Sequence, residues 1–221
     1  MKRVTYFRPI EVLPVIIFLV GFALKTYHVP FANIILISSG PVAFIILLLN
    51  NVFRQDKTFL PAKSMLALSN SVWLTYFSFR LLFLPSAPYI FYLAIGLSAI
   101  TLVFSIYKKQ LVIIQKLVLI IHIALGIFLA SYPNSKLYYM TVLGKSAKEY
   151  PTDYSYWVWN NYSWYLYHEQ QYDDALDANV LAKISAKSEF EGKTTDSTVI
   201  HQLDENKIRI ETRTWDSNKR F

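Results

Sequence analysis

The chain has 221 residues, of which 54% are hydrophobic and only 17% are charged, and its formal net charge is +7. Residues 1–131 carry 11 Lys/Arg against Glu11 and Asp56, whereas residues 132–221 carry 11 Lys/Arg against 13 Asp/Glu. A soluble domain would spread its charges more evenly, so the composition excludes an ordinary cytosolic enzyme. The basic excess lies between membrane-length apolar segments and is therefore no sign of nucleic-acid binding. The absence of cysteine excludes disulfides and thiolate sites.

Five segments reach the roughly 20 mainly apolar residues that a spanning helix needs. They cover residues 10–27, 31–53, 64–84, 89–107 and 111–131. The third segment is the most polar, and its polar side chains must face neighbouring helices or water. The pattern predicts a transmembrane helical domain of about five spans over residues 1–131.

The basic residues predict the orientation, because lysine and arginine accumulate on the side of a membrane that is not translocated. With five spans, nine basic residues share the side of the N-terminus, and only Lys25 and Arg80 lie on the other side among the membrane connections. We therefore expect a cytoplasmic N-terminus and a C-terminal domain, residues 132–221, on the outer side. A re-entrant third segment would give four spans and a cytoplasmic tail, but it would also place the basic loops on opposite faces.

The C-terminal domain is rich in aromatic residues, and ten of them lie between residues 150 and 172. On a helix that begins near Asp153, a suitable N-cap, they cover more than one face, so one packing partner cannot bury them all. The candidate partner-binding residues are Trp157, Trp159, Trp164, Tyr165 and Tyr172. A second helix over residues 172–187 follows a short polar turn, and the two helices form a predicted helical hairpin over residues 153–187.

This hairpin carries part of a repeat pattern. Five of its residues fall at the spacings of a tetratricopeptide repeat: Trp159, Ser163, Tyr172, Ala175 and Ala182. The two helices resemble one such repeat, although Gln170, Asn179 and Lys187 depart from the pattern and such repeats stack in threes or more to bury a core. The resemblance implies protein binding.

Residues 198–215 contain two runs of alternating apolar and polar residues around a polar turn. Val199, His201 and Leu203 alternate in the first run, and Ile208, Ile210 and Thr212 alternate in the second. This alternation is typical of a half-buried β-hairpin. The predicted fold class is therefore mainly α, a polytopic membrane helical bundle with a small α+β extramembrane C-terminal domain.

Polar and ionisable side chains within the apolar segments are the first candidates for function, because burying them in lipid is costly. They are Lys25, His28, Asn70, Arg80 and His122. Lys25 and Arg80 are also placed to snorkel to the headgroups. His122 either bonds a neighbouring helix, through Asn70 or Ser71, or relays protons, since imidazole titrates near neutral pH. No Asp or Glu occurs between residues 57 and 148, so the usual ion carrier of proton-driven transport is missing there.

Enzyme signatures are missing, because the chain has no HExxH, GxSxG or P-loop motif. His168, Glu169, Asp173 and Asp174 lie close together in the sequence. Such a group resembles a set of metal ligands but is more typical of a charged helix surface. We expect no catalysis, no cofactor and no metal.

Seven residues of the first membrane hairpin follow the pattern G-x-x-x-K-x-x-H-x-P-x-A-N with a glycine in the next helix: Gly21, Lys25, His28, Pro30, Ala32, Asn33 and Gly40. Residues 21–40 resemble the membrane hairpin of the gliding-motility motor subunit L family, which is associated with type IX secretion. The glutamate of that family's proton coupling is missing, because residues 41–44 are Pro, Val, Ala and Phe. The resemblance implies a bacterial inner membrane, with the tail then periplasmic, and helix–helix assembly, but no motor.

These observations predict a non-enzymatic inner-membrane subunit that docks or scaffolds a larger, hetero-oligomeric assembly through its aromatic-rich tail. Its partners would be the lipid bilayer and other membrane or periplasmic proteins, with no nucleic acid. The alternative is a small transporter or proton-linked channel that uses His122 and the polar face of segment 64–84. A membrane enzyme that acts on envelope lipid or glycan through the aromatic tail is a third hypothesis.

Overall fold

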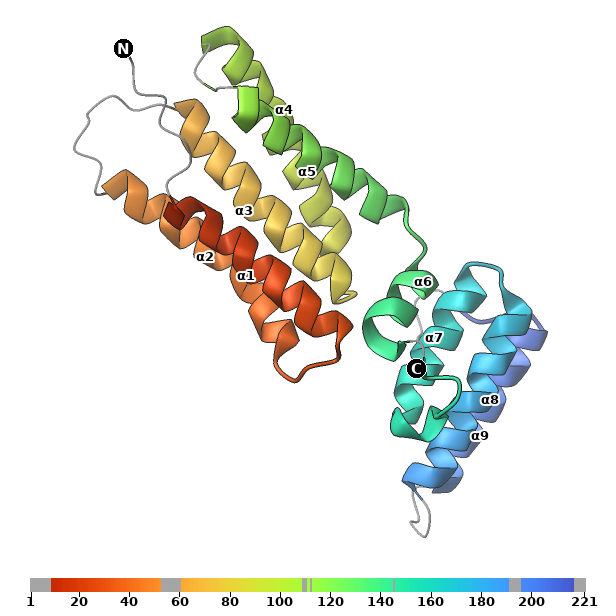
Figure 1. Cartoon of the computed structure of the whole chain (residues 1–221). Helices are drawn as coiled ribbons and strands as arrows, with labels where there is room; N and C mark the ends of the chain where they lie inside the picture. Colours follow the sequence, from red (N-terminus) through yellow and green to blue (C-terminus); the bar gives the residue numbers. More distant parts are fainter. Residues whose placement is uncertain are drawn as a thin grey trace. The chain divides into compact units, whose positions relative to one another are not determined.

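The computed structural model describes residues 9–52, 61–108, 111, 113–144, 146–190 and 196–216. The chain forms two compact units, Met1–Tyr132 and Pro133–Phe221 (Figure 1). Within the described ranges every regular element is a helix.

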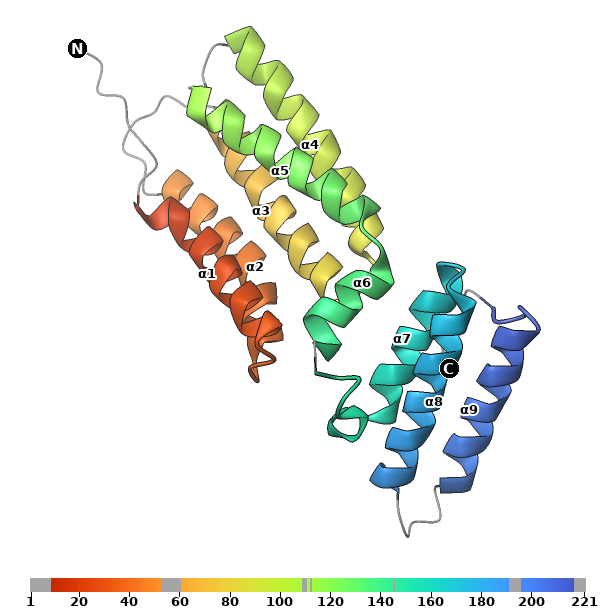
Figure 2. The same cartoon turned by 45° about the vertical axis from the view of Figure 1, so that its right-hand side comes forward.

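The first unit is a bundle of helices: α1 (Pro9–Thr26), α2 (Ala32–Val52), α3 (Pro61–Leu81), α4 (Ala87–Lys108) and α5 (Ile113–Ser131). Figures 1 and 2 show these helices side by side, and α3 packs against α2, α4 and α5. The α1–α2 and α3–α4 connections are short, and each contains a proline, Pro30 or Pro85, which cannot continue an α-helix. The central helix of the unit is therefore α3.

Three helices of the described part are long and apolar enough to cross a membrane, over Ala32–Leu49, Ala87–Tyr107 and Ile113–Ser131. The prediction of about five spans is therefore wrong. The apolar part of α1, Val12–Thr26, is shorter than the length that a crossing needs. The polar side chains of α3 lower its hydropathy, and this helix packs against α2, α4 and α5.

Glycines allow the helices of the first unit to approach closely. A Cβ atom added to Gly40 in α2 would lie 2.1 Å from Thr75 Oγ1 of α3, and one added to Gly126 in α5 would lie 2.0 Å from the Trp73 ring of α3. A Cβ atom at Gly21 in α1 would lie 2.9 Å from the backbone nitrogen of Leu36 in α2. Small residues at helix contacts are typical of membrane bundles, where close packing and not the hydrophobic effect joins the helices.

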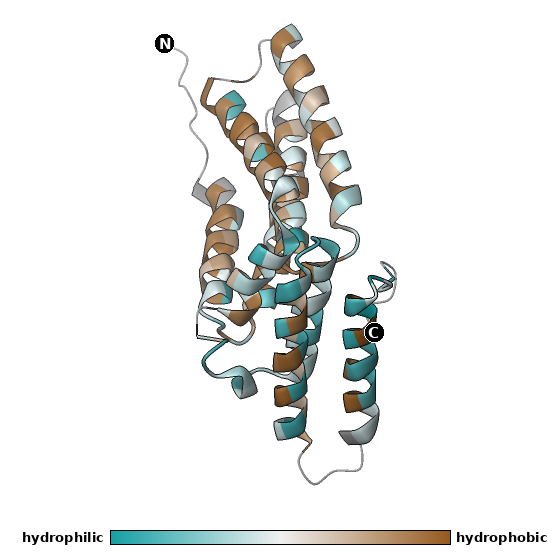
Figure 3. Cartoon of the chain, turned by 90° about the vertical axis from the view of Figure 1, so that its right-hand side faces the viewer, coloured by the Kyte–Doolittle hydropathy of each residue, from teal (hydrophilic) through white to brown (hydrophobic). Residues whose placement is uncertain are grey.

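The outward faces of the same helices are apolar. Exposed side chains occur on α1, α2, α4 and α5, among them Ile16, Leu19, Ile45, Val103 and Ile121. Figure 3 shows hydrophobic residues along these helices, in contrast to the more polar second unit. Such a surface is unfavourable in water and is suited to lipid.

The second unit contains four α-helices in its described residues: α6 (Asn134–Tyr138), α7 (Tyr156–His168), α8 (Tyr172–Glu189) and α9 (Asp196–Glu211). A π-helical turn, η1 (Tyr139–Leu143), follows α6, and a 3-10 turn, η2 (Pro151–Asp153), precedes α7. The middle helix is α8, which packs against both α7 and α9. Its four alanines Ala175, Ala178, Ala182 and Ala186 are buried and let the neighbouring helices approach.

The predicted β-hairpin over residues 198–215 is wrong, because this segment contains α9 and the described residues contain no strand. The buried residues of α9 are Val199, Leu203, Asn206 and Ile210, which recur every three or four positions. That spacing gives one face of a helix, and it buries an asparagine that the alternating pattern treats as a turn residue. The second unit is therefore all-helical, and the α+β assignment is also wrong.

Candidate functional site

The polar side chains of α3 bond the neighbouring helices. Ser71 Oγ donates to the Gly40 carbonyl oxygen of α2 at 2.9 Å, and Ser78 Oγ donates to the Leu36 carbonyl oxygen of α2 at 2.7 Å. On the other side, Ser69 Oγ lies 3.1 Å from Thr101 Oγ1 of α4. These hydroxyls are buried, and each of them joins α3 to another helix.

Two aromatic residues of α3 continue this network. Trp73 Nε1 donates to Ser98 Oγ of α4 at 2.8 Å, and Tyr76 OH donates to the Gly126 carbonyl oxygen of α5 at 3.3 Å. The polar face that the alternative hypothesis assigns to a transport path thus holds α2, α4 and α5 around α3. Buried polar groups with partners stabilise a unique packing, whereas groups without partners are costly.

Asn70 and His122 are not bonded to each other as the sequence-based interpretation of His122 proposes. Asn70 Oδ1 is buried and has no hydrogen-bond partner among the described residues. His122 Nδ1 donates to the Val118 carbonyl oxygen of its own helix at 2.8 Å. The imidazole stacks on Phe77 of α3, with ring centroids 5.9 Å apart and an angle of 10° between the planes. The hydrogen bond of His122 to Val118 replaces the predicted bond to Asn70 or Ser71.

The two cations that the sequence marks as candidates, Lys25 and Arg80, differ in their contacts. Arg80 Nε donates to the Leu129 carbonyl oxygen at 2.9 Å, and Arg80 Nη2 donates to the Tyr132 carbonyl oxygen at 2.7 Å. Arg80 therefore caps the C-terminal end of α5, where a positive charge is favourable. The Lys25 side chain is half-buried and makes no hydrogen bond or ion pair within the described part of the chain.

His28 lies in the turn after α1 and is exposed. Partial desolvation and, second, the nearby charge of Lys25 lower the pKa of His28 below its usual range. The neutral imidazole is therefore favoured at neutral pH. His28 also has a φ of 55°, the left-handed region that few residues other than glycine adopt readily.

The α1–α2 and α3–α4 hairpins share one turn, which the sequence reasoning missed. The Val29 amide donates to the Leu24 carbonyl oxygen at 2.9 Å, and the Leu84 amide donates to the Phe79 carbonyl oxygen at 3.0 Å. In each turn the residue before the donor has a left-handed backbone, with a φ of 55° at His28 and 57° at Phe83, and the bond ends the helix there. The matching residues are 55 positions apart in the sequence.

A signal for this repeat is present in the sequence. A cation, a proline and an alanine follow at the same spacing in both hairpins: Lys25, Pro30 and Ala32, then Arg80, Pro85 and Ala87. Both alanines are buried at the start of the second helix. A search for internal similarity at this spacing would have found the pair of turns.

The tail buries most of the predicted partner-binding residues. Trp159 is 0% exposed, Trp164 and Tyr165 are buried, and Tyr172 is half-buried. Only Trp157 is largely exposed, at 49%. Of the ten aromatic side chains between residues 150 and 172, three are buried, and α7 packs against more than one partner, namely α8, α6 and η1.

Specific contacts hold the buried aromatic residues. The Tyr138 ring of α6 packs on Tyr165 of α7 with centroids 5.2 Å apart, and Trp159 Nε1 donates to the Pro151 carbonyl oxygen at 3.1 Å. Burial and the nearby carboxylate of Asp174 raise the pKa of Tyr162 to about 12. Its phenol therefore stays protonated at any physiological pH.

The acidic and histidine residues of the α7–α8 turn have structural partners. Glu169 accepts hydrogen bonds from both the amide and the hydroxyl of Ser135, at the start of α6. His168 Nδ1 donates to the Trp164 carbonyl oxygen at 2.9 Å. Among the described residues no group of three or more His, Cys, Asp or Glu side chains is arranged to hold a metal ion.

No known protein family, curated protein or solved structure matches the chain. The resemblance of residues 21–40 to the gliding-motility motor subunit L family, and that of residues 153–187 to a tetratricopeptide repeat, therefore stay predictions.

Proposed function

We propose that the protein is a non-enzymatic subunit of a larger membrane assembly, anchored by its first unit and docked through its second. The main support for this proposal is that polar side chains of α3 form hydrogen bonds with the neighbouring helices. Ser71, Ser78 and Tyr76 bond α2 and α5, so these side chains hold the bundle together and do not line a path for ions. The apolar outward faces of the same unit suit a lipid anchor.

The second unit supplies the docking surface. Its buried aromatic core gives it a fixed shape, so the side chains on its outside are presented without a large ordering cost on binding. Trp157 is the exposed aromatic residue nearest to the start of α7. Partly exposed tryptophans are frequent anchors of protein interfaces.

We place the protein in a bacterial inner membrane with the N-terminus in the cytoplasm and the tail in the periplasm. Three crossings put the N-terminus and the tail on opposite faces. The N-terminal side then carries four basic residues before the first crossing, Lys2, Arg3, Arg8 and Lys25, and two between the second and third crossings, Lys108 and Lys109. The more basic side stays in the cytoplasm. The motif of residues 21–40 links this assembly to gliding motility or type IX secretion.

Cysteine labelling tests the orientation, because the chain has no native cysteine. Ser197→Cys places a thiol at an exposed position of the tail, and Lys2→Cys places one near the N-terminus. A membrane-impermeant maleimide added to intact spheroplasts should label the first variant and leave the second unlabelled until the membrane is opened. The reverse pattern would overturn the topology and the docking proposal with it.

Photo-crosslinking tests the docking role. A photoreactive amino acid at Trp157 of the full chain, in the membrane of a producing bacterium, should give discrete adducts with other envelope proteins. The same residue at Lys148, an exposed polar position, is the matched control and should give none. A chain that forms no adduct at Trp157 and purifies in mild detergent as a lone monomer would contradict the proposal.

One observation favours the second candidate, a proton-linked channel. Asn70 Oδ1 is buried without a partner, and His122 is the one imidazole within the described part of α5. The variant His122→Leu distinguishes the two candidates in proteoliposomes loaded with a pH-sensitive dye. Proton flux that is present in the native chain and lost in this variant, with unchanged thermal stability, would favour the channel. The scaffold proposal expects no flux in either chain.

A further inference from the structure

One side of α8 carries a continuous exposed stripe, formed by Asp173, Asp177, Val180, Ile184 and Lys187. The spacings between them are four, three, four and three residues, so at about 100° per residue the five side chains lie within about 80° of one another. Val180 is 51% exposed and Ile184 is 43% exposed. We call this set the α8 stripe.

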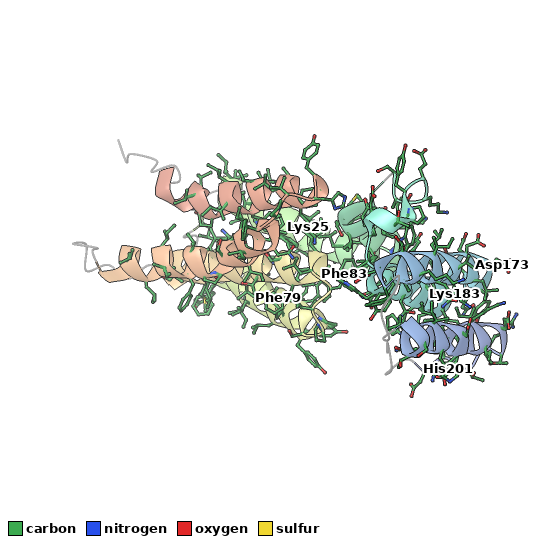
Figure 4. The ribbon with its side chains drawn as sticks, turned by 90° about the horizontal axis from the view of Figure 1, so that it is seen from below. Lys25, Phe79, Phe83, Asp173, Lys183 and His201 are labelled. Carbon is green, nitrogen blue, oxygen red and sulfur yellow. The ribbon has the colours of Figure 1, made fainter. Side chains whose placement is uncertain are left out.

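Other residues of α8 contact the neighbouring helices of the same unit. Its alanines pack on the neighbouring helices, Asn179 Nδ2 donates to the Leu203 carbonyl oxygen of α9 at 3.2 Å, and Lys183 forms an ion pair with Asp204 of α9 at 2.6 Å. By contrast, Asp173, Asp177 and Lys187 form no ion pair within the described part of the chain. Figure 4 labels Asp173 near one end of α8 and Lys183 further along it.

The charges of the α8 stripe are ordered along the helix. Aspartates lie at its N-terminal end, the two aliphatic residues lie in the middle, and Lys187 lies at its C-terminal end. Val180 is seven residues from Asp173 and seven from Lys187, about 10 Å in each direction at 1.5 Å per residue. The pattern is therefore self-complementary about a two-fold axis through Val180.

We propose that the α8 stripe is a self-association surface and that its occupant is the α8 stripe of a second copy, packed antiparallel. A two-fold axis brings each Asp173 opposite the second copy's Lys187 and buries the aliphatic residues of both copies between the helices. A two-fold contact repeats every pairing, so the charge match occurs twice. A parallel arrangement would place like charges side by side, which is unfavourable.

The size of this surface sets its strength. One helix face of this length buries less than the ~1,200 Å² typical of stable complexes, so an isolated pair of tails would associate weakly. Anchoring confines both copies to one membrane plane, and this confinement raises their effective concentration. The dimer is therefore expected for the full chain in a membrane. This association goes beyond the proposed docking to other proteins, which uses Trp157 on a different helix.

Cysteine crosslinking tests the two-fold contact in nanodiscs that contain the full chain at two or more copies per disc. Val180→Cys lies at the proposed axis and should form an intermolecular disulfide under mild oxidation. His201→Cys on the exposed side of α9 is the matched control and should give at least tenfold less dimer. Equal crosslinking at both positions, or none at Val180→Cys, would overturn the proposal.

A charge swap on the Val180→Cys background tests the orientation. Asp173→Lys alone and Lys187→Asp alone each replace two opposite-charge pairs by two like-charge pairs, and each should lower the crosslinking rate about tenfold at low salt. The double variant restores opposite charges and should restore the rate. A double variant that stays as slow as the single ones would overturn the antiparallel pairing. In membranes of a producing bacterium, a crosslink of Val180→Cys only to another protein would replace the second copy by a different partner and also overturn the proposal.

Discussion

The α1–α2 and α3–α4 hairpins end in the same turn, yet their matching cations do different things. Arg80 donates to two carbonyl oxygens at the end of α5, whereas the ammonium group of Lys25 makes no hydrogen bond or ion pair within the described residues. The turn follows from local sequence, because a proline and a left-handed residue end each helix at the same place. The role of the cation depends on which helix packs beside it, and only the second hairpin has the end of α5 within reach.

The same contrast appears one turn earlier in each helix. Tyr76 of α3 bonds the Gly126 carbonyl oxygen of α5, and the matching residue of α1 is Gly21, which lies against the backbone of α2. The second hairpin is thus arranged to hold α5, and the first is arranged to bring its own two helices together. Substitutions at these positions can separate the two arrangements.

The largest effect is expected from Gly126→Ala. The added Cβ would lie 2.0 Å from the Trp73 ring, and overpacking of this kind costs about 3 kcal/mol or more when a large ring must move. The matched control is Gly96→Ala in α4, where nothing lies within 4 Å of the added atom, and it should be neutral or slightly stabilising. Thermal unfolding in mild detergent measures both. Similar losses for the two variants would contradict the close contact of α5 with α3.

The second prediction compares the two cations directly. Arg80→Ala removes two charge-assisted hydrogen bonds and should cost about 2–3 kcal/mol. Lys25→Ala removes no such bond and should cost less than about 1 kcal/mol. Arg80→Lys should fall between them, because it keeps the charge and loses the planar fork. Unfolding in detergent that showed equal losses for Arg80→Ala and Lys25→Ala would remove the difference between the hairpins.

A smaller effect is expected at the shared turn. His28→Gly should stabilise the first hairpin by about 1 kcal/mol, since glycine adopts the positive φ of this position without strain. Phe83→Gly should gain less or lose stability, because the Phe83 ring is partly buried. Tyr27→Gly, one residue earlier and exposed, is the control and should bring no gain. A loss of stability in His28→Gly would show that its ring, and not its backbone, matters.

The smallest effect concerns pH. Because desolvation and the Lys25 charge lower the pKa of His28, the folded chain binds this proton less readily than the unfolded chain does. His28 therefore leaves the free energy of unfolding at its full value above pH 6.5, the ordinary pKa of histidine, and lowers that free energy as the pH falls further. Lys25→Met should reduce this decline, and His28→Gln should abolish it. Unfolding at pH 8 and pH 5 compares the three chains, and an unchanged difference in His28→Gln would contradict the assignment.

The sequence predicted some of these features and missed others for physical reasons. Long apolar runs predict helices that are suited to lipid, and α2, α4 and α5 have the length and hydropathy of a membrane span. In α3 the apolar run is broken by Ser69, Ser71 and Ser78. The hydrogen-bond partners of these serines lie on other helices, far away in the sequence. Hydropathy counts these hydroxyls as polar and gives no information on whether another helix satisfies them.

The tail shows a different limit. Val199, Leu203 and Ile210 fit both a strand and a helix over a short window, and the buried Asn206 decides for the helix through its bond to Asn160 of α7. Trp157 and Trp159 look equivalent in composition, but they lie on different sides of α7, and one is exposed while the other is fully buried. Trp159 differs from Trp157 in its contacts, because its Nε1 donates to the Pro151 carbonyl oxygen and its ring packs on Tyr154 and Tyr162.

The placement of Trp73 gives the protein an internal optical reporter. It is the single tryptophan of the first unit, since the other four are residues 157, 159, 164 and 215 of the second. Its ring is shielded from solvent and lies against a glycine of α5, so its emission should be blue-shifted for as long as those two helices stay together. Replacing the four tail indoles by phenylalanine would leave one chromophore that reads the opening of the bundle in real time.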